Sequence, residues 1–367
     1  MSQEETAALF HTLDHDDMLT NIFQFCSLSQ LISEIMPTCK RWFRIALEFD
    51  NFIDQSQSFY NLDYENNFEE YCNSLVSQFT TGLTLFKPSR NHVEILVNCG
   101  SFKKLKTLAI TSYESNVKTS CEMLQLVANS DISKNIQWLD LYRFRTDDEG
   151  LKIIAESNNF NKLNTLISYW NGFTIEGIKI LSSHPKFSKL VKLEMTDLGG
   201  DEGFKLMCES PNFSNLTDLD IGMTSIGNEG MKYFASSPYL KKLKRLILDR
   251  CSFDAEGVRI MCSSENAASI EELEFEYTDI GDEGVKYLAQ SPNMKNLTRL
   301  DITRTNSGND CVQYIVNSPY LKKLNSISYE HSYSEDPYYE GKSIDEKEGN
   351  LLDKFMFHCE AENDGMR

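Results

Sequence analysis

The stretch NLTDLDIGMTSIGNEGMKYFASSP, residues 215–238, contains the pattern that decides the fold. Its first half alternates apolar and polar residues, which predicts a β-strand with one buried face. Its second half has apolar residues at helical spacing, at Met231, Phe234 and Ala235. Asn228 is expected to cap this helix and Pro238 to end it. The stretch therefore predicts a strand, a turn and a helix.

The same unit recurs along the chain at intervals close to 27 residues. A Glu-Gly pair marks each helix start, with its glycine at Gly150, Gly177, Gly203, Gly230, Gly257 and Gly284. A Ser-Pro or His-Pro step marks each helix end, at Pro185, Pro211, Pro238, Pro292 and Pro319. The second leucine of each predicted strand falls at Leu108, Leu139, Leu166, Leu193, Leu219, Leu246, Leu273 and Leu300, and then at Ile327. Leu83 and Leu85 fit an earlier, degenerate strand.

A single unit of this kind cannot bury its apolar side, so the units are expected to stack into an α/β solenoid. The strands would form one curved parallel sheet and the helices an outer layer. Residues 83–332 resemble the ribonuclease-inhibitor-like class of leucine-rich repeats. Five residues after the second leucine, most repeats have a small polar residue that would keep the turn hydrogen bonded. Phe144 and Leu198 depart from this column, which predicts local irregularity after their strands.

The N-terminal segment, residues 10–55, has a different pattern that predicts a small all-helical domain. Its DDMLTNIF and CKRW stretches resemble the F-box, the helical module that docks on the Skp adaptor of cullin-RING ubiquitin ligases. Asp14 and His15 stand where family members usually have Leu-Pro. The resemblance implies binding to a Skp adaptor through Met18, Leu19, Ile22, Phe23, Leu28, Leu31 and Trp42. Alternatively, these helices only cap the first apolar edge of the solenoid.

The segments on either side of the solenoid complete the expected domain organisation. Residues 56–82 are predicted to form a helical linker or N-terminal cap. Residues 333–347 interrupt the period and form an acidic insertion, which is either part of a C-terminal cap or a regulatory loop. Residues 348–367 begin with a last Glu-Gly helix and are predicted to be the C-terminal cap helix and tail.

Composition and charge narrow the possible functions. The chain has a net charge of −19, with an excess of acids at both ends, and no basic face is expected. Binding to nucleic acid is therefore not expected, because phosphate backbones would be repelled. The sequence shows neither a long apolar run nor a secretory signal, so we expect no membrane association and a cytoplasmic or nuclear location. The ten cysteines form no CxxC pair, and apolar positions such as Cys208 and Cys262 suggest buried, reduced thiols.

Catalytic and metal-binding motifs are not apparent in the sequence. The six histidines have no ligand spacing, and acidic runs such as Asp147-Asp148-Glu149 recur at helix starts, where they are structural. We expect no cofactor, no metal and no catalytic activity. One rival remains, because Ran GTPase-activating proteins also join this repeat class to an acidic tail.

The exposed face of the sheet is the predicted site of client binding. Its middle column is largely acidic: Asp140, Glu194, Asp220, Glu274 and Asp301. Two groups of residues are candidate client contacts, namely the aromatic residues Trp138, Tyr142, Tyr169 and Trp170, and the arginines Arg245, Arg250, Arg299 and Arg304. Aromatic side chains of this kind dominate protein interfaces. The arginines would either pair with neighbouring acids or read an acidic or phosphorylated client segment.

The sequence therefore predicts the substrate-recognition subunit of a Skp-cullin-F-box ubiquitin ligase. Its partners would be a Skp-family adaptor, the cullin complex and an unidentified protein client on the concave repeat face. The alternative is a non-catalytic interaction scaffold whose N-terminal helices only cap the solenoid.

Overall fold

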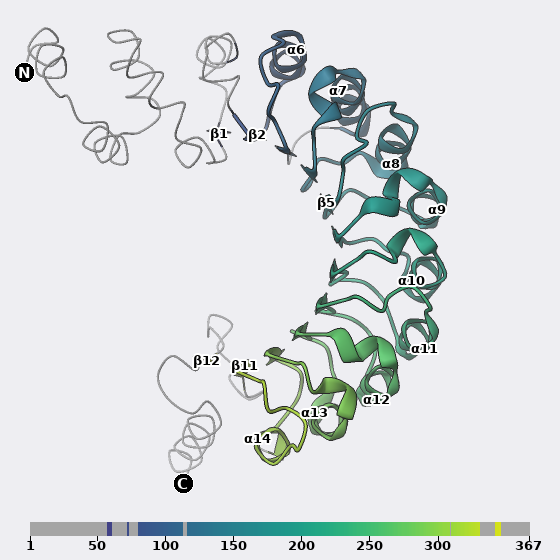
Figure 1. Cartoon of the computed structure of the whole chain (residues 1–367), viewed down its shortest axis with the longest axis vertical. Helices are drawn as coiled ribbons and strands as arrows, with labels where there is room; N and C mark the ends of the chain where they lie inside the picture. The colour runs from purple at the N-terminus through teal and green to yellow at the C-terminus, as the bar shows by residue number, and fades with distance from the viewer. Residues whose placement is uncertain are drawn as a thin grey trace, which may run out of the picture.

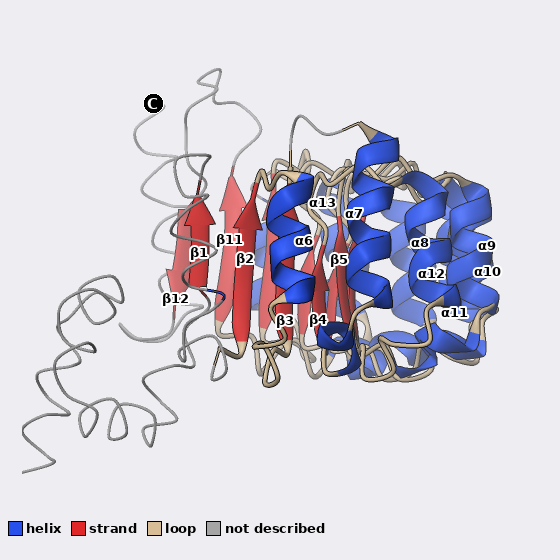
Figure 2. Cartoon of the chain, turned by 90° about the horizontal axis from the view of Figure 1, so that it is seen from above, coloured by secondary structure: helices blue, strands red, loops and turns tan. Residues whose placement is uncertain are grey.

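The computed structural model describes residues 57–60, 72, 80–112, 116–308, 310–330 and 342–345. Strands and helices alternate along these residues and form a curved arc, with the sheet on the inner, concave side and the helices on the outer side (Figure 1). Seen from above, the helices form a second layer against one face of the sheet (Figure 2). The expected leucine-rich-repeat solenoid is confirmed.

One sheet of twelve strands runs through the arc in sequence order. Its strands are β1 (Gln57–Tyr60), β2 (Gly82–Phe86), β3 (Thr107–Thr111), β4 (Trp138–Asp140), β5 (Thr165–Ser168), β6 (Lys192–Met195), β7 (Asp218–Asp220), β8 (Arg245–Ile247), β9 (Glu272–Glu274), β10 (Arg299–Thr303), β11 (Ser326–Glu330) and β12 (Lys342–Asp345). Neighbours pair in parallel from β1 to β11, and β12 pairs antiparallel to β11. Parallel pairing follows from the helix that connects each strand to the next.

The helices of the outer layer are α6 (Arg90–Asn98), α7 (Val117–Asn129), α8 (Asp147–Glu156), α9 (Ile175–Ser183), α10 (Gly200–Cys208), α11 (Asn228–Ser236), α12 (Ala255–Ser263), α13 (Gly281–Gln290) and α14 (Asp310–Val316). Their inner faces bury apolar residues, as Met231 and Phe234 of α11 illustrate. The helical spacing read from the sequence is therefore confirmed in this repeat. Several repeats also contain a short 3-10 turn after the helix, such as Pro211–Phe213.

The leucine column sets the register of the sheet. Leu83 pairs with Leu108, and the same column continues strand by strand to Leu300 and Ile327. These side chains are almost completely buried in one continuous core. A shift of one residue would place them on the concave face, so burial fixes the register firmly.

The starts of α11 and α14 are completed by a side chain from the preceding repeat. Asp201 lies in the first turn of α10, yet its Oδ1 accepts hydrogen bonds from the backbone N–H groups of Gly227 and Gly230, at 2.7 and 2.9 Å. Asp282 of α13 binds the backbone N–H groups of Gly308 and Cys311 in the same way. The acidic residues at helix starts thus satisfy the unpaired donors of the next helix.

This arrangement explains the glycine column. A Cβ atom at Gly230 would lie 2.6 Å from Asp201 Oδ1, and one at Gly177 would lie 2.2 Å from Asp148 Oδ1. Any side chain there would displace the capping carboxylate. Glycine at Gly177 and Gly230 therefore allows the preceding repeat to approach the helix start, whereas at Gly150, Gly203 and Gly284 a Cβ would first meet Thr146, Leu198 and Ile280 of the same repeat.

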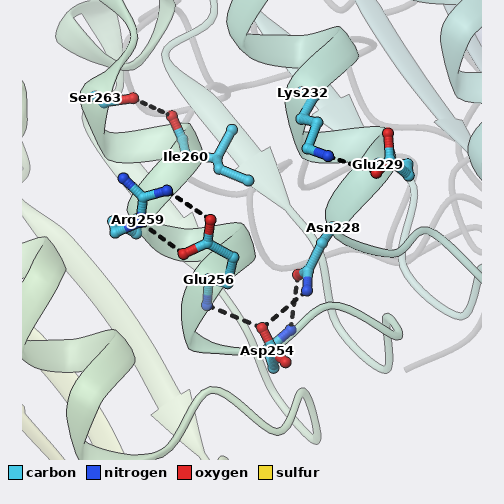
Figure 3. Close-up of polar contacts among 8 residues, drawn as sticks. All are labelled: Asn228, Glu229, Lys232, Asp254, Glu256, Arg259, Ile260 and Ser263. Carbon is cyan, nitrogen blue, oxygen red and sulfur yellow. Dashed lines mark hydrogen bonds and ion pairs between the residues drawn. The ribbon is translucent and has the colours of Figure 1, made fainter.

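The predicted capping role of Asn228 is wrong in detail. The helix α11 begins at Asn228, and Gly227 is its N-cap. The Asn228 amide instead bonds across to Asp254, donating to its carboxylate at 3.0 Å and accepting from its backbone N–H at 3.2 Å (Figure 3). Asp254 is the N-cap of α12 and accepts from the N–H of Glu256.

The helix ends are held by a column of buried serines. The helices of the proline-bearing repeats end two or three residues before their prolines, so the predicted ends are correct. Each of these serines donates to a carbonyl near the end of the preceding helix: Ser157 to Ala128, Ser210 to Ser182, Ser237 to Cys208, Ser264 to Ala235, Ser291 to Cys262 and Ser318 to Ala289. The carbonyl groups that end a helix thereby gain donors.

The turn column behaves as the sequence predicts. Thr224, Thr278 and Thr305 each donate to the carbonyl three residues earlier or to that of the preceding repeat. Phe144 and Leu198 are buried instead. Their turns each contain three residues with positive φ, namely Arg143, Arg145 and Asp147 in one and Asp197, Gly199 and Gly200 in the other. The expected irregularity is therefore present.

Two boundaries need correction, and several predictions lie outside the described residues. The segment 56–82 was expected to be helical, but Gln57–Tyr60 forms strand β1 and extends the sheet before residue 83. Lys342–Asp345, within the expected acidic insertion, forms strand β12. The F-box-like segment 10–55, with its seven candidate adaptor contacts, and the cap helix and tail at 348–367 lie outside the described residues.

Candidate functional site

The concave surface has two parts, which we call the floor and the rim. The floor consists of the outward-facing side chains of the strands. The rim consists of one residue that follows each of the strands β4 to β10 by one to three positions, namely Arg143, Trp170, Asp197, Met223, Arg250, Tyr277 and Arg304. All seven have φ between 53° and 61° and none is glycine. Left-handed backbone is unfavourable for such residues, by roughly 1 kcal/mol each, so cross-repeat bonds must hold it.

Backbone bonds between repeats hold the rim in place. The N–H of Met223 donates to the carbonyl of Asp249 at 2.7 Å, and that of Arg250 donates to Glu276 at 2.7 Å. The rim side chains therefore have fixed origins at one edge of the floor. Because the backbone at these residues is already ordered, less conformational entropy is lost when a partner binds the rim.

The predicted aromatic residues lie at both edges of the floor of β4 and β5. Trp138 starts β4 and is 38% exposed, whereas Trp170 lies in the rim and is 43% exposed. Between them, the rings of Tyr142 and Tyr169 meet edge to face with centroids 6.2 Å apart. The structure thus brings the two tyrosines together and places the two tryptophans at opposite edges.

Three exposed apolar residues were not identified from the sequence. Met223 is 49% exposed, Val191 is 39% exposed and Tyr277 is 36% exposed. Met223 and Tyr277 occupy the rim column that also contains Trp170, and Val191 immediately precedes β6. Comparing the repeats at this rim position would have found Met223 and Tyr277, since they stand where other repeats have charged residues.

The predicted acidic column lies on the floor and is largely withdrawn from water. Burial raises the pKa of Asp140, Asp220 and Glu274, because desolvation disfavours the charged form. Asp249, on the same floor, has its pKa raised to about 7 by burial and then by Glu274. Its Oδ1 accepts from the N–H of Glu276 at 2.7 Å.

Tyr169 is tied to this column. Its hydroxyl donates to Asp220 Oδ2, and Asp220 Oδ1 accepts from the N–H of Gly222 at 3.0 Å. Burial, followed by the nearby Asp220 carboxylate, raises the pKa of Tyr169. The phenol therefore stays protonated and acts as a donor that orients Asp220.

The four predicted arginines fall into two pairs. Arg245 contacts Glu272 and Glu274 at 3.4 and 3.3 Å, and Arg299 lies 3.9 Å from Glu274. Arg250 and Arg304 stack on the ring of Tyr277, with guanidinium carbons 4.1 and 4.9 Å from its centroid. The first pair neutralises floor carboxylates, and the second pair belongs to the rim.

The outer face of the solenoid carries regular pairs of opposite charge. Glu229 pairs with Lys232 on α11, and Glu256 pairs with Arg259 on α12 (Figure 3). Equivalent pairs occur at Glu149–Lys152, Glu176–Lys179 and Glu283–Lys286. A feature repeated in five helices is a solvated surface and not a specific site.

Within the described residues, no three histidine, cysteine or acidic side chains are arranged to hold a metal ion. None of the described helices is long and apolar enough to cross a membrane. Cys208 and Cys262 are buried, and burial raises their pKa, so both remain thiols. Cys99 differs, since a hydrogen bond from Cys72 lowers its pKa to about 6.

Comparisons with known proteins agree with the repeat. A family model described as "Leucine Rich repeat" matches residues 214–235 and 266–289. No curated protein matches the sequence. A chain of the yeast Rad7 and Elc1 complex is 14% identical over 88% of this chain and 90% of its own, with a TM-score of 0.48. An internalin from Listeria monocytogenes is 15% identical over 69% of this chain and 81% of its own, with a TM-score of 0.39.

The matched repeats, the leucine register and the arc of strand–helix units lead to one conclusion. The described residues form a curved solenoid of leucine-rich repeats.

Proposed function

We propose that this protein holds a protein client on the concave face of its solenoid, as the substrate-recognition subunit of a Skp-cullin-F-box ubiquitin ligase. The observation that carries client binding is the exposure of Trp138 and Trp170 on a face whose frame needs no aromatic residue. Large exposed aromatic side chains are a feature of interaction sites.

The link to a ubiquitin ligase rests on the sequence of residues 10–55, with its resemblance to the F-box. The N-terminal helices would bind the adaptor and the solenoid would bind the client. The chain would make and break no bond, and transfer of ubiquitin would be promoted by proximity.

Proximity labelling of the full chain in cells tests client binding. A variant with Trp138→Ala and Trp170→Ala should lose the labelled client, because both anchors are removed. Tyr239→Ala, which follows the helix stop at Pro238 and lies away from the strands, is the control and should keep it. A client that is retained by the tryptophan variant would contradict binding on the concave face.

Co-purification with a Skp-family protein tests adaptor binding. The unchanged chain should associate, and Ile22→Asp with Phe23→Asp should abolish the association. Absence of association, or association that survives both substitutions, would remove the ligase assignment.

The alternative is an interaction scaffold whose N-terminal residues only cap the solenoid. One observation favours it: Cys72, which precedes β2, is fully buried in the solenoid core. Deleting residues 1–55 separates the two functions. Unfolding or aggregation would support the cap, whereas a stable solenoid that loses one partner would support the F-box.

A further inference from the structure

Exposed apolar side chains lie at both ends of strands β4 to β7. Trp138 and Val191 lie where β4 and β6 begin, and Trp170 and Met223 lie in the rim beyond β5 and β7. Between 38% and 49% of each residue is exposed. A bound partner could therefore make apolar contacts at both ends of these strands, on either side of the floor.

The floor between these ends carries acidic side chains that nearby cations compensate only in part, since Arg245 of β8 acts on Asp220 through its charge. Lys192 pairs with Glu194 at 2.7 Å. Among the ion pairs of the described residues, none includes Asp140 or Asp220. Asp140 Oδ1 accepts from the N–H of Tyr142, and Asp220 accepts from Tyr169 and Gly222, so both carboxylates are oriented by neutral donors. Oriented carboxylates that form no ion pair with a cation favour a positively charged group.

The aromatic rings at the ends are also placed for cations. The ammonium of Lys192 lies 5.2 Å from the Trp138 ring centroid, and the guanidinium of Arg143 lies 5.6 Å from that of Trp170. These distances are in the range of cation–π contacts. An acidic or phosphorylated segment between these ends would face the carboxylates of Asp140 and Asp220.

We infer that the client presents an extended segment in which a lysine or arginine is flanked by apolar residues, and that this segment lies along strands β4 to β7. The basic side chain would reach Asp140 and Asp220, and the flanking residues would contact the exposed residues at the two ends. An extended chain rises about 3.3 Å per residue, so five or six residues of the client would span roughly 15–20 Å. This is about the length of one repeat from the start of its strand to its rim residue. This inference rests on the proposed client binding and specifies its chemistry.

A set of fluorescent nine-residue peptides tests the inference on the full chain. One peptide has a central lysine between leucines, a second replaces the lysine with glutamate, and a third replaces it with glutamine. Anisotropy titrations should show the lysine peptide binding at least about tenfold more tightly than the glutamate peptide, a difference of about 1.4 kcal/mol. Asp140→Asn with Asp220→Asn should abolish this preference, because asparagine keeps the acceptor oxygens and removes the charges.

Matched variants make the result interpretable. Glu229→Gln with Glu256→Gln removes two charges from the outer helices and should leave the preference unchanged. If the floor variant has an altered thermal unfolding transition, Trp170→Ala with Met223→Ala serves instead, since both side chains are exposed; it should weaken all three peptides.

Three results would overturn the inference: tighter binding of the glutamate peptide, no binding of any peptide, or a lysine preference that survives Asp140→Asn with Asp220→Asn. None of these depends on a Skp adaptor. The proposed function and this inference can fail separately. If substitution of Trp138 and Trp170 abolishes client labelling in cells but the peptides show a preference for glutamate, the proposed function stands and only the basic character of the client segment is wrong.

Discussion

Single residues in this solenoid act on the neighbouring repeat as much as on their own. Asp201 belongs to α10 but caps α11 through Gly227 and Gly230. Its effect on stability should therefore exceed that of an exposed acid in the same turn.

Asp201→Ala should lower the free energy of unfolding by about 1–2 kcal/mol, because α11 loses a carboxylate that satisfies two of its first donors. Chemical denaturation measures the loss. Glu202→Ala, one residue further along the same helix and exposed, is the control and should change stability by less than about 0.5 kcal/mol. Equal effects of the two substitutions would mean that the cross-repeat cap contributes nothing.

Asp249 makes stability depend on pH. Its pKa is about 7 in the folded protein and 3.8 ordinarily, so the folded state binds more protons between these values. The free energy of unfolding contributed by this group therefore falls as pH rises from about 4 to about 7. At about 1.4 kcal/mol per pKa unit, the loss reaches at most about 4 kcal/mol.

Asp249→Asn should remove this loss while keeping the acceptor for the Glu276 N–H. The variant should gain stability over the unchanged chain when both are compared at pH 8, and the gain should shrink towards pH 4. Asp131→Asn, on an exposed carboxylate, is the control and should show no such trend. A constant difference across the pH range would disprove the role of Asp249.

At the scale of elements, the buried serine column ties each helix end to the following repeat. Ser264 donates to the carbonyl of Ala235, at the end of α11, and accepts from the N–H of Asn266. Its neighbour Ser263 is exposed and donates to Ile260 within its own helix (Figure 3).

Ser264→Ala should destabilise the protein by about 1–3 kcal/mol, because a buried carbonyl and a buried N–H lose partners. Ser263→Ala should be nearly neutral. Thermal and urea unfolding of the two variants, side by side, distinguish a structural column from a merely frequent residue. Indistinguishable transitions would count against the column.

Most elements could be predicted from the sequence, because the period of leucines, glycines and prolines reports directly on burial, close approach and helix ends. Details that depend on the next repeat could not. Asn228 has the right residue type for an N-cap, but its amide bonds across to Asp254. The rim was also missed as a class, since left-handed backbone at Arg143 or Met223 is imposed by bonds between repeats and not by residue type.

The candidate site was predicted in part. The column of acids lies where the alternation of the strands placed it, whereas Tyr142, Tyr169 and Trp170 lie just beyond the ends of β4 and β5 and not on the strands. The partners of the arginines were not predictable, because Arg250 and Arg304 meet on Tyr277 only after three repeats are stacked.

For the whole molecule, the net charge of −19 acts together with the acidic floor. A basic client segment would be attracted at long range, and salt would screen that attraction. Raising the ionic strength from about 20 to about 200 mM should slow association of the lysine peptide by about tenfold, while its dissociation rate changes little.

Stopped-flow fluorescence measures these rates. The glutamine peptide, which lacks the charge, is the control and should associate at a rate nearly independent of salt. Association of the lysine peptide that does not respond to salt would exclude electrostatic steering of the client.

The caps that pass from Asp201 to α11 and from Asp282 to α14 give the solenoid a polarity. A unit that ends in such a cap supplies the acceptor for its successor, so it can be lost or duplicated without cost only if the new junction keeps a donor next to that acceptor. Asp201 and Asn228 occupy the capping position in their repeats, two residues before the glycine. Ala255 occupies the same position in its repeat and has no acceptor, and α13 accordingly begins without a side-chain cap. During evolution, insertions and deletions of whole repeats would therefore be tolerated unequally along this chain, and the junctions into α10 and α13, where Ile175 and Ala255 occupy this position, have no such cap to preserve.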